Sequence, residues 1–111
     1  MTKIYDICEF AMERIVSGDY ALLQKEGALT RVSENDIKCI LTEYEPNEFP
    51  IMPPDDYFEK SADIYQYTDG SGYHVDIDFW YNAGQSDLTL QLDIRRKQDQ
   101  LHFVIDDIHV L

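Results

Sequence analysis

The C-terminal part of the chain alternates apolar and polar residues over residues 73–81, 88–95 and 101–106. Successive side chains of a strand face opposite sides, so each segment predicts a strand with one apolar and one polar face. Short polar stretches separate the segments, and we therefore predict an antiparallel meander. The alternation continues to Val110 only if one extra residue is inserted near Asp106–Asp107, which predicts a β-bulge.

Matching apolar to apolar positions across the two turns gives an expected register for the meander. In this register Ile77 lies opposite Leu92. On the polar face, Asp76 then lies opposite Asp93, and Asp93 lies opposite His102. Directly opposed Cβ atoms are about 4.5–5.5 Å apart, so these polar side chains are expected to interact.

Helical periodicity dominates the N-terminal part of the chain. Apolar residues spaced three and four apart predict amphipathic helices over residues 3–17 and 34–44, with a short helix over residues 20–25 between them. Ser33 is followed three positions later by Asp36, a variant of the capping box that predicts where the helix of residues 34–44 begins.

Residues 45–59 contain all four prolines of the chain, so we expect them to form an irregular, acidic connector. Residues 61–67 then predict a fourth strand at the edge of the sheet. Together the elements predict a single α+β domain over residues 1–111, with N-terminal helices packed on one face of a four-stranded antiparallel meander. This order of elements resembles cystatin-like and NTF2-like arrangements.

The chain is strongly acidic, with 22 acidic residues, 9 lysines and arginines and a net charge of −13. Such a charge disfavours binding to nucleic acid and to anionic membranes, and it favours a basic protein partner. No apolar run approaches the roughly 20 residues of a membrane-spanning helix, and the N-terminus lacks the pattern of a signal peptide. Cys8 and Cys39 are expected as buried free thiols on helices, as in a reducing compartment, so we expect a cytoplasmic protein.

The polar side of the predicted sheet holds the main candidate residues, Asp76, Asp78, Asp93 and His102, with Trp80 at one end. Carboxylates with a histidine are workable metal ligands, and a carboxylate–histidine pair is able to act as a general acid and base. Trp80 beside acidic residues instead suggests a protein-binding face, because tryptophan is enriched at interface anchors. No catalytic or cofactor motif occurs in the chain. We therefore predict no catalytic residue, no metal and no cofactor, and favour a binding face.

Three stretches, DGSGYHVDIDFWY, SDLTLQLDI and IDDIHVL, are similar to an uncharacterised family of small bacterial α+β domains without established catalytic residues. In size and acidity the chain also resembles immunity proteins of bacterial toxin systems, including contact-dependent growth inhibition. This resemblance implies a non-enzymatic protein that binds and occludes a basic, nuclease-type toxin domain. The implied binding residues are Asp76, Asp78, Trp80 and Asp93, with Glu48, Asp55 and Asp56 as a second patch.

Two alternatives remain open at this stage. The first is an NTF2-like ligand binder or enzyme that uses His102 with Asp93 in a cavity beneath the helices. The second is an assembly subunit that associates with itself through the edge strand or through residues 45–59, which leaves both a monomer and a homodimer possible.

Overall fold

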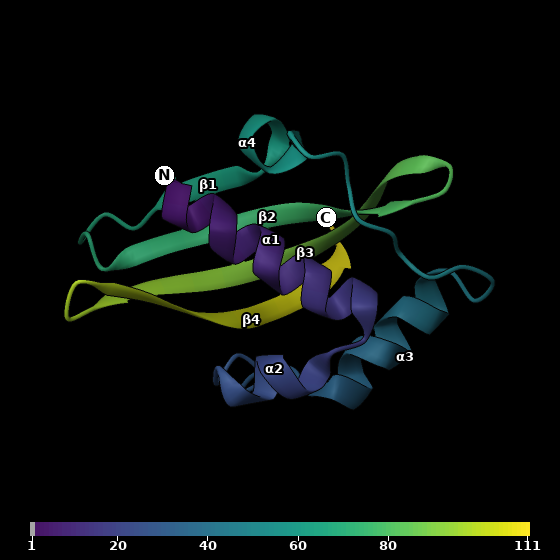
Figure 1. The fold of residues 1–111 in the computed structure, drawn as a ribbon, viewed down its shortest axis with the longest axis horizontal. Helices are drawn as coiled ribbons and strands as arrows, with labels where there is room; N and C mark the ends of the chain where they lie inside the picture. The colour runs from purple at the N-terminus through teal and green to yellow at the C-terminus, as the bar shows by residue number, and fades with distance from the viewer. Residues whose placement is uncertain (1) are drawn as a thin grey trace.

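The computed structural model describes residues 2–111, with side chains described from Lys3 onward. It confirms an α+β fold in which helices precede and flank one antiparallel sheet of four strands in the order β1-β2-β3-β4 (Figure 1). The elements are α1 (Thr2–Ser17), α2 (Tyr20–Lys25), α3 (Glu34–Tyr44), α4 (Tyr57–Ser61), β1 (Asp63–Gln66), β2 (Gly72–Tyr81), β3 (Gly84–Lys97) and β4 (Gln100–Val110). Among the described residues, no helix combines the length and apolar character needed to cross a bilayer.

The three predicted helices form where the periodicity placed them. The capping box at the start of α3 is present, because Ser33 Oγ accepts from the Asp36 amide at 3.1 Å while the Asp36 carboxylate accepts from the Ser33 amide at 3.0 Å. The hydrogen bond from the Ser33 amide to the carboxylate, followed by the interaction with the Ser33 side chain, lowers the pKa of Asp36. Cys8 is buried as expected, but Cys39 is exposed. Cys39 follows the buried Ile37 by two positions, which places it on the other side of the helix.

The proline-rich connector is not wholly irregular, because it ends in the short helix α4, which we had not predicted. The Tyr57 hydroxyl accepts from the Asp78 amide at 2.9 Å, and the Ile51 amide donates to the Trp80 carbonyl at 2.8 Å. β1 is short and pairs with β2 only as far as Asp76. The connector therefore satisfies the outer edge of β2 where β1 no longer covers it.

The predicted register was wrong by two residues in both hairpins. Ile77 lies opposite Leu90, Asp76 opposite Gln91, and Asp93 opposite Val104. The pairs expected between Asp76 and Asp93 and between Asp93 and His102 therefore do not form. A shift of two residues keeps every side chain on its predicted face, so the faces of the sheet are unaffected.

The register differs because both turns are tighter than predicted. β2 ends at Tyr81 and β3 begins at Gly84, so residues assigned to a loop belong to the hairpin. An irregularity between Asp78 and Trp80 then shifts the pairing with β3. The second turn consists of Gln98 and Asp99, both in the left-handed region, with φ of 50° and 65°. Sequences with these residues rarely form such a turn, which favours glycine and asparagine.

The bulge predicted in the last strand is present. Gln91 pairs with Asp107 and Leu92 with Ile105, so Asp106 is the extra residue. The bulge returns Ile108 to the buried side, where it joins the core. The predicted change in the alternation of apolar and polar residues along β4 is therefore caused by a β-bulge, as expected.

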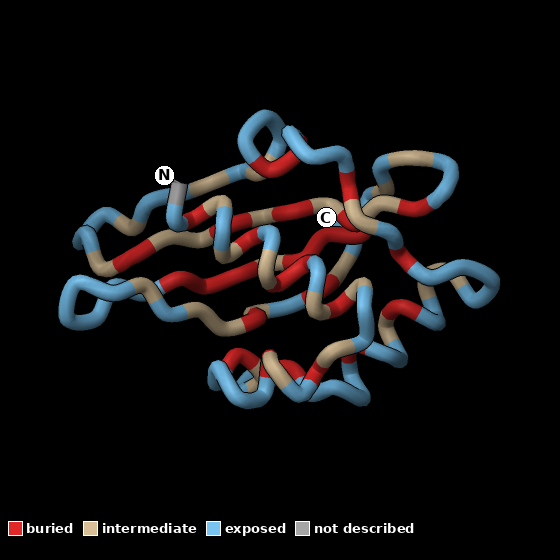
Figure 2. The backbone as a smooth tube through the Cα atoms, in the orientation of Figure 1, coloured by how far each residue is buried: buried red, intermediate tan, exposed pale blue. Residues whose placement is uncertain are grey.

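One hydrophobic core lies between the helices and the apolar face of the sheet. α1 crosses that face, and α2 and α3 lie beside β4 (Figure 1). The buried parts of the chain follow β2 and β3 and the inner sides of the helices (Figure 2). The opposite side, which we call the polar face, carries no helix of the described chain. Its side chains are Asp63, Tyr65, His74, Asp76, Asp78, Thr89, Gln91, Asp93, Arg95, His102 and Val104.

Candidate binding surface on the polar face of the sheet

One half of the polar face carries opposed carboxylates. Asp63 of β1 lies directly opposite Asp76 of β2. Asp76 is partly compensated, because His74 Nε2 lies 2.7 Å from its Oδ1 and the Gln91 amide donates to it at 3.0 Å. Asp63 is exposed and forms no ion pair within the described chain. Like charges directly opposite on a sheet destabilise it, so we expect repulsion between the two carboxylates that His74 and Gln91 relieve only in part.

An exposed aromatic residue lies beside these carboxylates. The Tyr65 side chain is 55% exposed, and its ring centroid lies 6.1 Å from that of His74, its partner across the strands. Tyrosine offers a rigid apolar ring and a hydroxyl, which is why it is enriched in protein interfaces. We call Asp63, Tyr65, His74 and Asp76 the acidic half of the polar face.

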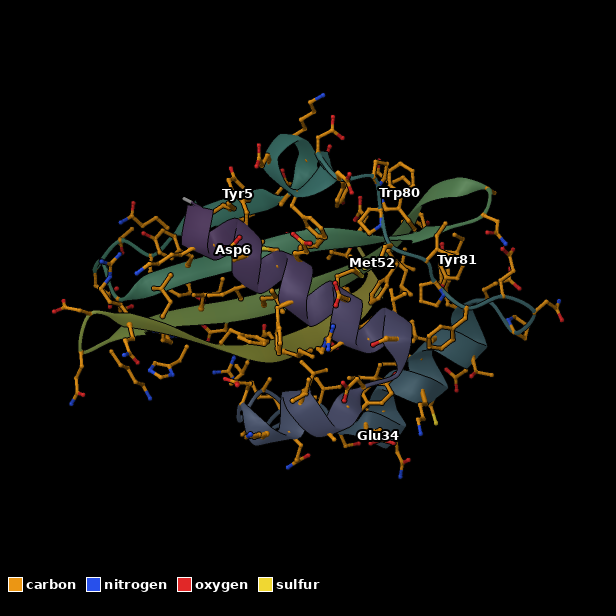
Figure 3. The ribbon with its side chains drawn as sticks, in the orientation of Figure 1. Tyr5, Asp6, Glu34, Met52, Trp80 and Tyr81 are labelled. Carbon is orange, nitrogen blue, oxygen red and sulfur yellow. The ribbon has the colours of Figure 1, made fainter. Side chains whose placement is uncertain are left out.

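Asp78 and Trp80 are less available than the sequence suggested. The Asp78 carboxylate accepts from Gln85 Nε2 and from Thr89 Oγ1, each at 2.8 Å. Trp80 is half-buried and packs edge-on against Tyr57, with the ring centroids 5.7 Å apart. Figure 3 shows Trp80 at the end of β2, where the connector passes. Its indole N–H is buried without a hydrogen-bond partner in the described chain, so Trp80 is partly covered rather than open as an anchor.

Asp93 occupies a different environment on the same face. It is only 4% exposed, and it accepts from the Tyr67 hydroxyl, from Arg31 and from Arg95, each at 2.9 Å. Burial raises the pKa of Asp93, but the hydrogen bonds from Tyr67, Arg31 and Arg95 outweigh it and hold the pKa below its ordinary value. The carboxylate is thus neutralised within the chain, which removes Asp93 from the predicted partner-binding set.

Arg31, in the loop between α2 and α3, was not among the predicted site residues. Arg31 bridges Asp93 and Asp106, with its contact to Asp106 at 2.8 Å. Its pKa is raised, first by the hydrogen bond to Asp106 and then by that to Asp93. No periodic pattern predicts this contact, because loop residues follow none. In the sequence, the only indication of an ion pair here is a single basic residue in an acidic chain.

Arg95 completes the basic end of the polar face. Its guanidinium lies 4.6 Å from the centroid of the Tyr67 ring and donates to Ser71 Oγ at 3.1 Å as well as to Asp93. With Arg31, Lys97 and His102, it lines an open hollow of about 340 Å³. We call these four residues the basic end.

The three acidic residues predicted on the connector do not form one patch. Glu48 is exposed in the turn after α3, beside Glu45 and Phe49. Asp55 and Asp56 directly precede α4, which lies beside β1 (Figure 1). Asp56 forms an ion pair with Lys60 at 2.6 Å, whereas both aspartates are exposed. Asp55 and Asp56 therefore lie before α4, and Glu48 lies after α3.

The interior beneath the helices is lined by apolar side chains. His102 and Asp93 both lie on the polar face, away from that interior, so the cavity proposed for an NTF2-like enzyme is not built from them. Within residues 2–111 no group of three potential ligands is arranged to hold a metal ion.

Comparison with known proteins gives a family but no characterised relative. No curated protein and no solved structure matches the chain. One family model matches residues 12–111, which include the C-terminal end of α1 and the whole sheet. The chain therefore belongs to the family described as a domain of unknown function, DUF7668.

Proposed function

We propose that this protein is a non-enzymatic binding protein that docks a basic protein partner on the acidic half of its polar face. The observation that carries the proposal is the pair of carboxylates, Asp63 opposite Asp76, on an uncovered sheet beside the exposed Tyr65. A lysine or arginine from a partner would relieve the repulsion between the two carboxylates. Binding is then favoured because it removes a repulsion that destabilises the free protein.

The chemistry fits a protein of the immunity kind, acting on a basic, nuclease-type toxin domain. The net charge of −13 speeds encounter with a cationic partner by electrostatic steering. A nuclease binds phosphates with lysine and arginine, and the carboxylates of the acidic half would occupy those groups. Inhibition would arise by occlusion, which needs no catalytic residue.

Coexpression with the product of the gene immediately upstream tests the proposal. We expect a stoichiometric complex with a basic protein that is toxic when expressed alone and harmless with this chain. The double variant Asp63→Lys, Asp76→Lys should slow association at low salt by about tenfold or more, because it reverses the local charge. Protection from toxicity should weaken in the same variant.

The matched control is Glu9→Lys with Glu43→Lys, two exposed helix positions that change the net charge by the same amount. We expect this control to keep most of the wild-type association rate. Equal slowing in both double variants would mean that net charge alone governs binding, and the assignment to the acidic half would be abandoned. A complex unaffected by either variant would contradict the electrostatic mechanism.

A further inference from the structure

The outer edge of β4 is open at its hairpin end. The Ile105 amide donates to the Ala28 carbonyl at 2.9 Å, so the backbone groups of Ile105 point away from β3. Backbone direction alternates along a strand, so the N–H and C=O groups of Phe103 and Leu101 point outward as well. They have no hydrogen-bond partner in the described part of the chain. Figure 1 shows this end of β4 extending beyond α2.

An apolar hollow lies on the helix side of this open edge. It has a volume of about 360 Å³ and is lined by the apolar side chains of Ile7, Phe10, Leu101 and Phe103, together with the carboxylates of Asp6 and Glu26. The rings of Phe10 and Phe103 pack edge to face, with centroids 6.1 Å apart. Each of the four apolar side chains is only partly buried, so the hollow is able to receive one large apolar side chain.

The basic end of the polar face lies on the other side of the same edge. The hollow of about 340 Å³ at the basic end is lined by three of the nine lysines and arginines of the chain, Arg31, Arg95 and Lys97. Its lining also holds two carboxylates, those of Glu26 and Asp93. The lining therefore holds one more cation than carboxylates, while Arg31 also pairs with Asp106 beside it. Lys97 is the cation of the lining that forms no ion pair in the described chain. Arg31 and Arg95 are already held by Asp93, so a ligand carboxylate meets cations that lose little freedom on binding.

We propose that the open edge of β4 binds an extended segment of another protein in which an apolar residue is followed by an acidic one. A strand added to this edge would pair with the outward groups of Leu101 and Phe103. Its successive side chains point to opposite sides, so an apolar side chain enters the Phe10 hollow while its neighbour faces the basic end. The inference is independent of the proposed function, which uses the acidic half and a basic partner.

The charges favour a different protein over a second copy of this chain. Two β4 edges paired about Leu101 and Phe103 would place the basic end of one copy beside the basic end of the other. Like charges opposed across strands are unfavourable. An acidic segment has the opposite charge and the correct alternation, so it is the occupant that the surface fits.

The probe is a seven-residue peptide in which leucine and aspartate alternate, titrated into ¹⁵N-labelled protein and followed by NMR. We expect saturable shifts centred on the amides of Leu101 and Phe103. A peptide of alternating leucine and lysine should bind at least about tenfold more weakly, because it places cations against Arg31, Arg95 and Lys97. Equal binding of the two peptides, or shifts centred elsewhere, would overturn the proposal.

The variant Leu101→Pro tests the backbone pairing. It removes an outward N–H without removing a hydrogen bond between β3 and β4, and Leu101→Ala is the control that loses the side chain but keeps the N–H. We expect the proline variant to bind the aspartate peptide about tenfold more weakly than the alanine variant, at a similar urea midpoint. Similar affinities in the two variants would overturn strand addition.

Lys97→Glu tests the charge without touching the backbone or the core, since Lys97 is exposed and forms no ion pair within the described chain. We expect weaker binding of the aspartate peptide, whereas the control Lys60→Glu on α4 leaves it unchanged. Sedimentation of the wild type gives a further check. A dimer that Leu101→Pro dissociates would assign the edge to a second copy and overturn the proposal.

Discussion

The acidic half and the basic end of the polar face lie on neighbouring strands of one sheet, yet their carboxylates have opposite roles. Asp93 is buried and held by Tyr67, Arg31 and Arg95. Asp63 is exposed and lies opposite another carboxylate. Both occur as polar residues of strands. The difference arises because Arg31, in the loop between α2 and α3, reaches Asp93 at the basic end. In the described chain, no lysine or arginine pairs with Asp63 or Asp76 of the acidic half.

The largest expected effect comes from removing the buried carboxylate. Asp93→Ala leaves the Tyr67 hydroxyl and two guanidinium groups without their common acceptor, and we expect a loss of about 2–4 kcal/mol in the free energy of unfolding. Urea denaturation measures this loss. Asp76→Ala, on the acidic half, should lower the unfolding free energy by less, because this variant also removes the repulsion between residue 76 and Asp63. A larger loss for Asp76→Ala than for Asp93→Ala would reverse the comparison.

The same carboxylate should contribute to the loss of stability in acid. The pKa of Asp93 is lower in the folded protein than the value of about 3.9 for an unfolded chain, so its stabilising contribution is present above pH 4 or so. The contribution is lost as the pH falls through the folded pKa. The difference in unfolding free energy between wild type and Asp93→Asn should therefore shrink below about pH 4. A constant difference from pH 7 to pH 2 or so would contradict this assignment.

A smaller effect separates the two tyrosines of the polar face. Tyr67→Phe removes the hydroxyl that donates to the buried Asp93, and we expect a loss of about 1 kcal/mol. Tyr65→Phe removes an exposed hydroxyl and should change the unfolding free energy by less than about 0.5 kcal/mol. Parallel thermal and urea unfolding of the two variants gives the comparison, and equal effects would show that Asp93 does not depend on Tyr67.

The smallest predicted effect has the opposite sign. Asp63→Asn removes one member of the opposed pair, and we expect the protein to gain about 0.2–1 kcal/mol of stability. The gain should decrease as NaCl is raised toward about 1 M, because exposed charges are screened. Destabilisation by Asp63→Asn at low salt would show that the pair is not repulsive in the folded protein, and the main support for the proposed function would be lost.

Sequence periodicity predicted the faces of the sheet but not the register. Each strand residue leaves the backbone on alternate sides whatever its partner, so the apolar and polar faces follow from local pattern alone. Register depends on the turns, and Gln98 and Asp99 adopt left-handed backbone conformations that their side chains do not favour. The short helix α4 escaped prediction because the prolines before it mark a break, and only five residues follow.

The candidate surface was predicted in part. Asp76 lies on the polar face as expected, whereas the burial of Asp93 was not predicted because it depends on Arg31, a loop residue distant in sequence. Asp63 and Tyr65 were predicted only as part of an edge strand. Their importance became visible when the pairing of β1 with β2 placed Asp63 opposite Asp76 and Tyr65 opposite His74.

The one-sided covering of the sheet bears on how such a domain is able to diverge. On β2, the side chains of Val75 and Ile77 are buried in the core beneath the helices, while those of His74 and Asp76 project from the other side of the same strand. Substitutions at the second set alter the surface offered to a partner while the packed interior is unchanged. We expect descendants of one ancestral domain to acquire new recognition by exchanging polar-face residues pair by pair, with the buried half of each strand acting as an inherited scaffold.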